Sequence, residues 1–251
     1  MNPVIQIKNL YKSFGEKKVL RGVSLDIHEG EIMYVIGKSG TGKSVLLKHL
    51  TALMRPDSGS ITIDNEDIFD LTEKELMKVR MKMGVLFQMA ALFDSMTVFD
   101  NVAFTLRRFT DKTEEEIKTI VSEKLSLVGL KAVEDLRPAS LSGGMQKRVG
   151  LARAIALGPK IVLYDEPTTG VDPILASAVD DLIYTLNKEL KVTTLVISHD
   201  MKSTLHTAHR VAMLYEGEFI LVGKPDEFKE SNDPVVYQFV QGMAKGPIAL
   251  V

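Results

Sequence analysis

The 251-residue sequence contains no cysteine. Disulfide bonds and thiolate metal sites are therefore excluded, and the composition fits a reducing compartment. The sequence also lacks any apolar run near the ~20 residues that a membrane-spanning helix needs, so we expect any work at a membrane to depend on a partner that spans it. The opening residues, MNPVIQIKNLYKSFGEKKVL, lack the apolar core of a signal peptide, and we therefore expect no export.

An excess of either charge is missing as well. Lys and Arg total 31, Asp and Glu total 33, and the net charge at pH 7 is −2. Nucleic-acid-binding proteins usually carry a strongly basic face, which this balance does not support, so we expect no nucleic-acid partner. Hydrophobic residues make up 45% and charged residues 25%, which is ordinary for a globular protein. The length is sufficient for one large domain with a substantial core.

Three continuous apolar runs are present, at 32–36, 161–164 and 193–197. Continuity, as opposed to alternation, indicates strands that are covered on both faces. Each run ends in polar residues: a glycine loop, an Asp-Glu pair and a Ser-His-Asp triplet. Open α/β sheets place their ligand sites at this edge. The pattern predicts a mostly parallel sheet with helices on both faces.

The remaining segments add three smaller features. Alternating apolar residues at 4–10 and 19–27 predict a small antiparallel sheet at the N-terminus. Capping boxes at Thr72 and Thr113 introduce a region of helical pattern that extends to about residue 136. After Gly217 we expect a hairpin, a helix through 235–240 and a loose Gly-Pro end.

The glycine loop after the first apolar run has the P-loop pattern, Gly-x-x-x-x-Gly-Lys-Ser. Glycines let backbone N–H groups converge on phosphate oxygens, and the following helix adds its positive dipole end. Lys43 is the candidate for neutralising the β- and γ-phosphates, and the Ser44 hydroxyl for binding Mg²⁺. A strand before the loop and a helix after it argue against a chance glycine turn. The candidate phosphate-binding residues are Gly37, Lys38, Ser39, Gly40, Thr41, Gly42, Lys43, Ser44 and Val45.

Asp165 and Glu166 follow the second apolar run. Asp165 is the candidate for holding Mg²⁺ through a water molecule, and Glu166 for orienting or deprotonating the attacking water. Read alone, Asp-Glu-Pro is also a good helix-starting turn, and the P-loop is what favours the catalytic reading.

The stretch 141–148, Leu-Ser-Gly-Gly-Met-Gln-Lys-Arg, resembles the signature of ABC ATPases. The order of P-loop, glutamine, signature, Asp-Glu and histidine is also that of the family. Its two glycines open a helix, predicted from Met145 on, and so provide a second anion-binding helix start. The resemblance implies an α/β P-loop NTPase of the ABC type that binds ATP and Mg²⁺. It also implies that two copies pair head to tail, so that Ser142, Gly143, Gly144 and Gln146 of one copy close on the nucleotide held by the other.

The resemblance assigns further residues one by one. Phe14 matches the aromatic that stacks on adenine; by itself it fits a core or loop aromatic equally well, and Tyr11 is the next candidate. Gln88 matches a metal and water contact, and His199 matches a contact to the γ-phosphate and the attacking water. Asp172 matches a dimer-contact loop, although Thr-Gly-Val-Asp replaces the usual Ser-Ala-Leu-Asp. A hydrolase triad at 198–200 is excluded, because adjacent residues on one backbone cannot easily form that relay.

The resemblance also divides the chain. Residues 1–87 and 160–225 correspond to the nucleotide-binding (RecA-like) core with its antiparallel β subdomain, 88–159 to a helical subdomain with the signature, and 226–251 to a C-terminal extension. Residues 84–103 and 237–247 resemble the ATPases of Mce-linked (Mla-type) phospholipid transport systems. In the first segment, Met89, Leu92 and Phe93 either form an apolar groove for a permease helix or face the core. The second segment either contacts the other ATPase copy or is a frayed terminus.

The function implied is an ATPase subunit at the cytoplasmic face of the inner membrane, held there by an integral permease that works with an Mce-domain protein. ATPases of amino-acid or metal-ion importers and non-transport ABC scaffolds stay open as alternatives. A DNA-repair ABC ATPase would need a long coiled-coil insertion, and a translation factor would need a second nucleotide-binding domain. This sequence contains neither. Glu166 and His199 argue against a module that binds nucleotide without hydrolysing it.

Overall fold

The computed structural model describes residues 3–249, and its contacts divide the chain into two compact units. Unit 1 holds the described residues up to Leu76 and those from Thr193 on, and unit 2 is Met77–Val192. The functional division expected at 87/88 and 159/160 stays a prediction, and its ends at 1–2 and 250–251 lie outside the described residues. Within the described residues, no helix is long and apolar enough to cross a membrane.

Unit 1 contains the antiparallel sheet expected near the N-terminus, in the order β2-β1-β4-β5. Its strands are β1 (Ile5–Phe14), β2 (Lys17–Ile27), β4 (Ser58–Ile63) and β5 (Glu66–Asp67). Both long strands extend beyond the predicted ranges. β1 continues past an irregularity around Asn9, whose φ is 46°. This local break in alternation explains why the pattern predicted only 4–10.

A second set of strands in unit 1 follows the order β10-β9-β3-β8. β3 (Ile32–Ile36) pairs in parallel with β8 (Thr193–Ser198) and with β9 (Arg210–Tyr215). The hairpin expected at Gly217 is present, because β10 (Glu218–Gly223) pairs antiparallel with β9. Every residue of β3 and β8 is buried, which confirms strands covered on both faces.

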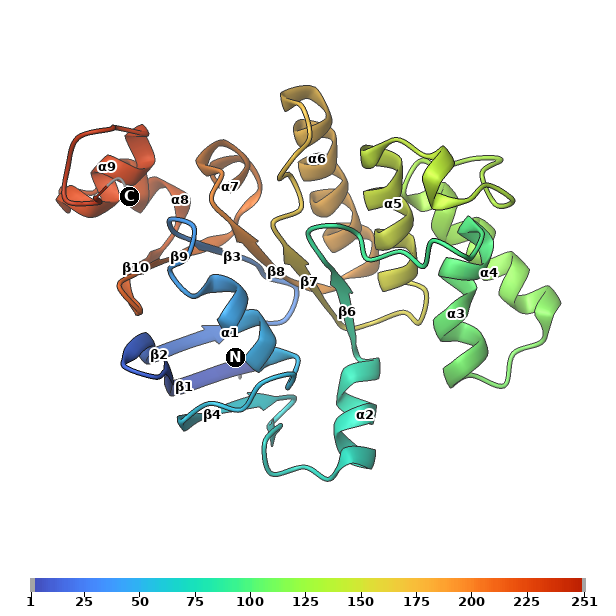
Figure 1. Cartoon of the computed structure of the whole chain (residues 1–251), viewed down its shortest axis with the longest axis horizontal. Helices are drawn as coiled ribbons and strands as arrows, with labels where there is room; N and C mark the ends of the chain where they lie inside the picture. Colours follow the sequence, from blue (N-terminus) through green and yellow to red (C-terminus); the bar gives the residue numbers. More distant parts are fainter. Residues whose placement is uncertain (1–2, 250–251) are drawn as a thin grey trace. The chain divides into compact units, whose positions relative to one another are not determined.

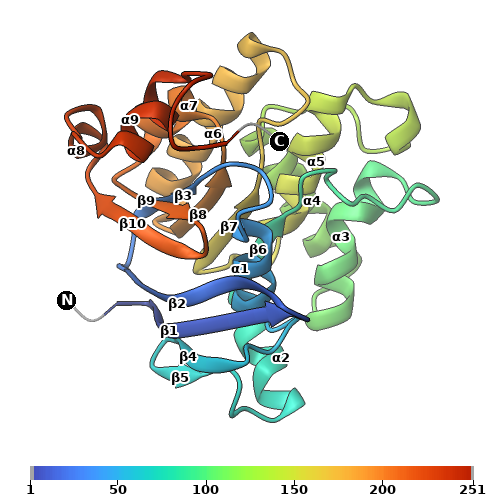
Figure 2. The ribbon, with the colours of Figure 1, turned by 60° about the vertical axis from the view of Figure 1, so that its left-hand side comes forward.

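Four helices lie wholly within the described part of unit 1, and those that follow β8 in the sequence gather on one side of β3, β9 and β10 (Figure 2). The four are α1 (Lys43–Leu50), α7 (Met201–Thr207), α8 (Pro225–Lys229) and α9 (Pro234–Gln241). The expectation of a loose Gly-Pro end is wrong for the described residues. The buried Gln238 side chain accepts from Ile248 N at 2.6 Å and donates to the carbonyls of Met243 and Ile248, both at 3.2 Å. This amide ties the segment to α9.

Unit 2 contains the parallel pair β6 (Met83–Leu86) and β7 (Ile161–Asp165) and most of the helices (Figure 1). The helices, including α2 across the unit boundary, are α2 (Glu73–Met81), α3 (Val98–Phe109), α4 (Glu114–Leu127), η1 (Pro138–Ser140), α5 (Gly143–Ala154) and α6 (Pro173–Leu190). α3, α4 and α5 pack on one another, and α5 also contacts β6. The capping boxes at Thr72 and Thr113 are both formed.

Candidate functional site

The P-loop connects the buried strand β3 to helix α1, which begins at Lys43 as predicted. Gly37 has a φ of 152°, and a Cβ there would lie 2.3 Å from the Leu214 carbonyl oxygen. Gly42 has a φ of 107°, and its Cβ would lie 2.9 Å from Val19 Cγ1. Glycine is therefore required at both positions, by conformation and by space. The result is a tight loop whose backbone lies close to neighbouring strands.

Lys43 is 4% exposed, and its ammonium is held inside the P-loop. Its Nζ donates to the carbonyls of Gly37 at 2.7 Å and Lys38 at 3.0 Å. A buried cation beside backbone N–H groups at a helix N-terminus is an arrangement that favours a bound anion.

A cavity of about 750 Å³ lies beside the P-loop within unit 1. It is lined by basic side chains, the outer part of the loop, the β9–β10 turn and the tail: Lys17, Lys18, Val19, Arg21, Lys38–Thr41, Tyr215–Gly217 and Pro247–Ala249. Lys38 Nζ donates to the Ala249 carbonyl at 2.5 Å. Four basic residues and one acidic residue, Glu216, line this cavity, and the excess of positive charge suits a polyanionic ligand.

His199 follows β8 at the same edge where the P-loop follows β3, because Ile36 and Ser198 are direct partners in the parallel register. The two residues that flank His199 make hydrogen bonds to nearby backbone groups. Ser198 Oγ accepts from Asp200 N at 2.9 Å, and the Asp200 carboxylate caps α7 through Lys202 N at 2.8 Å. Asp200 is thus engaged in helix capping, as expected if the triplet is not a hydrolase triad.

Glu166 lies in a tight turn after β7, with a φ of 50° that non-glycine residues rarely adopt. One carboxylate oxygen, Oε2, accepts from Thr169 Oγ1 at 2.6 Å, and the Glu166 carbonyl accepts from Thr169 N at 3.2 Å. In unit 2, Tyr164 is paired with Leu86, so Asp165-Glu166 and Gln88 follow adjacent parallel strands at one edge. The turn fixes both the backbone and the carboxylate of Glu166.

The signature residues occupy the start of α5, which begins at Gly143 and not at Met145 as predicted. Ser142 is the N-cap, and its Oγ accepts from Met145 N at 3.3 Å. A capping serine lets the two glycines enter the first helical turn, where their missing side chains matter little. Gln146 Nε2 donates to the carbonyls of Pro138 and Leu141 and so holds the preceding loop, while its contact with nucleotide stays a prediction.

Phe14 and Tyr11 lie at the surface, 48% and 46% exposed. The core reading of Phe14 is therefore wrong. Lys12 Nζ lies 5.7 Å from the centroid of the Phe14 ring. An exposed ring of this kind is available for stacking, and its role stays a prediction.

Comparison with known proteins identifies the family. The sequence model of the ABC transporter family matches residues 20–169. The probable ribonucleotide transport ATP-binding protein mkl of Mycobacterium leprae is 44% identical over 250 residues, which is 100% of this chain and 72% of that protein. The intermembrane phospholipid transport system ATP-binding protein MlaF of Haemophilus influenzae is 40% identical over 98% of this chain and 93% of its own. The chain belongs to the ABC transporter family.

A solved ATP-binding cassette supports the fold and the activity. The cassette MJ0796, a dimer in a post-hydrolysis state bound to ADP and Pi, superimposes with a TM-score of 0.81 at 34% identity. The match covers 88% of this chain and 98% of that one. This chain is accordingly an ABC-type ATPase, the ATP-binding subunit of a transporter, as its resemblance predicted.

In this ABC ATPase, the segment after Gln88 is exposed and firmly held at the same time. Met89 is 83% exposed and Phe93 41%, so the core-facing reading of these two side chains is wrong, whereas Leu92 is half-buried. Ala90 and Ala91 both have positive φ, and Arg153 of α5 donates to both of their carbonyls at 2.8 Å. Arg153 is partly buried, and desolvation lowers its pKa.

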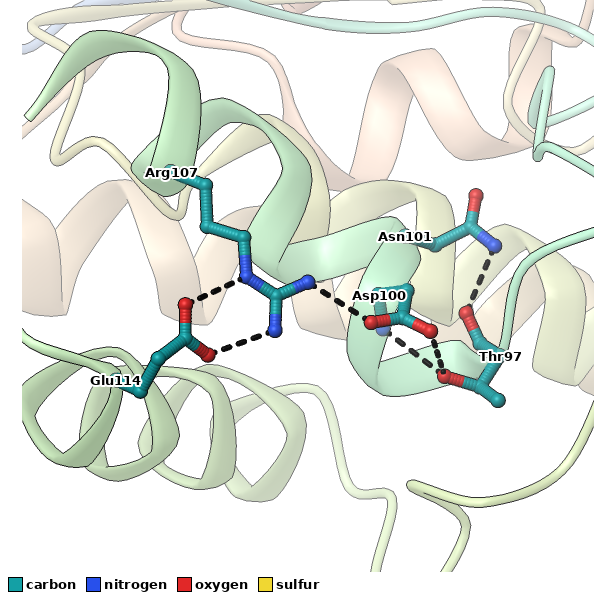
Figure 3. Close-up of polar contacts among 5 residues, drawn as sticks. All are labelled: Thr97, Asp100, Asn101, Arg107 and Glu114. Carbon is teal, nitrogen blue, oxygen red and sulfur yellow. Dashed lines mark hydrogen bonds and ion pairs between the residues drawn. The ribbon is translucent and has the colours of Figure 1, made fainter.

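Asn101 holds the other end of that segment (Figure 3). It is fully buried, accepts from Phe93 N at 2.8 Å, and donates to the carbonyls of Phe93 at 3.1 Å and Thr97 at 2.9 Å. On the outer side of α3, Arg107 makes a bidentate pair with Glu114 of α4 at 2.8 and 2.7 Å and bonds Asp100 at 2.9 Å. Hydrogen bonds from Arg107 lower the pKa of both carboxyls and raise that of the guanidinium.

Sequence reasoning missed the residues that support the site: Asn101, Lys147, Arg153 and Thr169. Lys147, within the signature stretch, is 8% exposed and donates to the carbonyls of Pro167 at 2.7 Å and Thr169 at 2.6 Å. The partners of Asn101, Lys147 and Arg153 are main-chain groups, which leave no mark in a sequence. For Lys147, the sequence offered one signal: a basic residue on the side of the signature helix that is buried, where a charged side chain needs partners.

Proposed function

We propose that this ABC ATPase hydrolyses ATP with Mg²⁺ between two head-to-tail copies and thereby drives a membrane permease that moves phospholipid between membranes. In each site, the P-loop and Lys43 bind the phosphates of one nucleotide, and Ser142–Gly144 of the second copy close on it. Phe14 stacks on the base. Glu166 orients the attacking water and accepts its proton, and His199 contacts the γ-phosphate.

The chemistry of the candidate metal ligands fits Mg²⁺. Ser44 is an exposed residue with a hydroxyl at the start of α1, and Asp165 carries a carboxylate at the end of β7. Oxygen ligands from few side chains, with phosphates completing the shell, are what Mg²⁺ prefers. Gln88 would add an amide oxygen. When bound, the ion would neutralise charge that develops on the phosphates.

The observation that carries the catalytic assignment is the Glu166 turn. A positive φ and the 2.6 Å hydrogen bond from Thr169 Oγ1 to Oε2 fix the Glu166 carboxylate directly after β7, where a base that orients water is expected. Two variants test it. Glu166→Gln should bind ATP with wild-type affinity, lose turnover by at least a hundredfold and trap the dimer, whereas Lys43→Ala should lose tight nucleotide binding. Ordinary turnover by Glu166→Gln would refute the assignment.

Exposed apolar side chains support a permease partner. Met89, Phe93 and Phe104 are all at least 40% exposed, and the rings of Phe93 and Phe104 lie 4.9 Å apart. Because Arg153 and Asn101 hold this segment rigidly, it is suited to receive an apolar helix. Through this contact the chain would sit at the cytoplasmic face of the inner membrane.

Phospholipid as cargo, and an Mce-domain protein as a further partner, rest on similarity over almost the whole chain to a phospholipid-transport ATPase. The name of mkl makes ribonucleotide transport the second candidate. The purified complex, reconstituted in vesicles, should move labelled phospholipid only with hydrolysable ATP. Movement of nucleotides and not of lipid would favour the second candidate.

A further inference from the structure

Lys147 connects the signature helix to the turn that carries Glu166. It lies on α5, five residues after the N-cap Ser142, and is 8% exposed. Its Nζ donates to the Pro167 carbonyl at 2.7 Å and to the Thr169 carbonyl at 2.6 Å. Both acceptors belong to the four-residue turn that Glu166 begins.

Burying the Lys147 ammonium at this position costs free energy. Taking a charged amine out of water is unfavourable, and burial lowers the pKa of Lys147 while the negative charge of Glu166 opposes that shift. An apolar side chain of similar volume would pack in the same place without this penalty. A buried ammonium that donates to two carbonyls of one turn therefore suggests that the shape of the turn matters.

Thr169 connects the contact with Lys147 to the Glu166 carboxylate. Its hydroxyl donates to Glu166 Oε2 at 2.6 Å, while its own carbonyl accepts from Lys147. Glu166 has a sparsely populated backbone conformation, which persists only when its surroundings impose it. The contacts thus run from α5 through Lys147 and Thr169 to the carboxylate.

We propose that Lys147 is a positioning residue that ties the signature helix to the catalytic carboxylate of the same chain. The proposal rests on the proposed function, in which Glu166 orients the attacking water. Because α5 starts at the signature, any shift of this helix when the signature closes on the nucleotide of the other copy would be carried to the Glu166 turn. One site would then sense whether the other is loaded.

The test is a double-mutant cycle on the full chain in its dimer, with Lys147→Met and Thr169→Val alone and combined. Steady-state turnover, ATP affinity and melting temperature are measured for each variant. We expect Lys147→Met to lower kcat at least tenfold with KM and nucleotide Kd within twofold of wild type. Lys147→Arg should recover most of kcat. The double variant should be no slower than the slower single variant, because both changes break one chain of contacts.

Two results would overturn the proposal. One is a kcat within twofold of wild type in folded Lys147→Met. The other is a double variant whose loss is the product of the single losses. If Lys147→Met does not fold, Lys147→Gln is used with the same criteria.

Arg148→Gln is the matched control. Arg148 is the next residue on α5, and its guanidinium donates to the Val128 carbonyl at 2.9 Å, outside the Glu166 turn. The fold-loss of kcat in the Arg148→Gln, Thr169→Val double variant should equal the product of the losses in the two single variants. Normal turnover by Glu166→Gln alone would contradict the proposed function, whereas the two results above contradict only the role of Lys147.

Discussion

Replacing Asn101 by alanine should destabilise the helical part of unit 2 strongly. The side chain is fully buried and makes three hydrogen bonds, one to Phe93 N and two to the carbonyls of Phe93 and Thr97. Each such bond contributes roughly 1 kcal/mol net, and leaving the main-chain groups buried without partners adds to the loss. We therefore expect a loss of about 3 kcal/mol, which lowers the melting temperature by roughly 6–12 °C for a chain of this size.

Calorimetry of the purified chain measures this loss, and hydrogen exchange locates it. The amide of Phe93 should exchange faster in Asn101→Ala, while amides of the buried strand β3 in unit 1 should change only with global stability. Asn232→Ala, at an exposed site outside helices and strands, should leave the melting temperature unchanged. A shift below about 2 °C in Asn101→Ala, with unchanged exchange at Phe93, would refute the role given to these bonds.

Three further outcomes follow from the contacts. The lowered pKa values of Asp100 and Glu114 mean that their pairing with Arg107 stabilises the fold above the ordinary carboxyl pKa and that this contribution is lost as pH falls through the lowered values. The difference in melting temperature between Arg107→Gln and wild type should therefore shrink on acidification from pH 7, and a constant difference would contradict this. Gln238→Leu should release the tail, seen as faster exchange at Ile248 N; retained protection would contradict it. Gly37→Ala should abolish nucleotide binding by distorting the P-loop, and a wild-type Kd would contradict it.

Residue chemistry decided what could be predicted from the sequence. The P-loop, the Asp-Glu pair and the signature need particular residue types at fixed spacing. The strands before the P-loop and the Asp-Glu pair are continuous apolar runs, so these motifs and their context could be predicted. The roles of Lys147 and Arg153 could not be predicted, because each side chain binds main-chain carbonyls that lie at least 20 positions away in the sequence. Any residue type supplies such a carbonyl. The tail was misjudged for a similar reason: one glutamine amide on α9 orders a Gly-Pro segment that has little apolar content of its own.

Backbone conformation was equally hidden. Glu166, Ala90 and Ala91 adopt positive φ at positions where glycine would be the expected residue. Glu166 is held by Thr169 of its own turn, and the two alanines are held by the distant Arg153. The start of α5 at Gly143 likewise depended on the cap that Ser142 supplies. Local propensity alone would place the helix later.

Affinity capture of its partners tests whether this ABC ATPase drives a lipid-transporting permease. Glu166→Gln serves as bait, with ATP and Mg²⁺, in detergent-solubilised membranes of the native organism; Lys43→Ala is the control that should trap no nucleotide-bound dimer. We predict recovery of a multi-spanning permease together with an Mce-domain protein. Recovery of soluble partners alone would rule out the permease partner, and a permease without an Mce-domain protein would argue against phospholipid as the cargo.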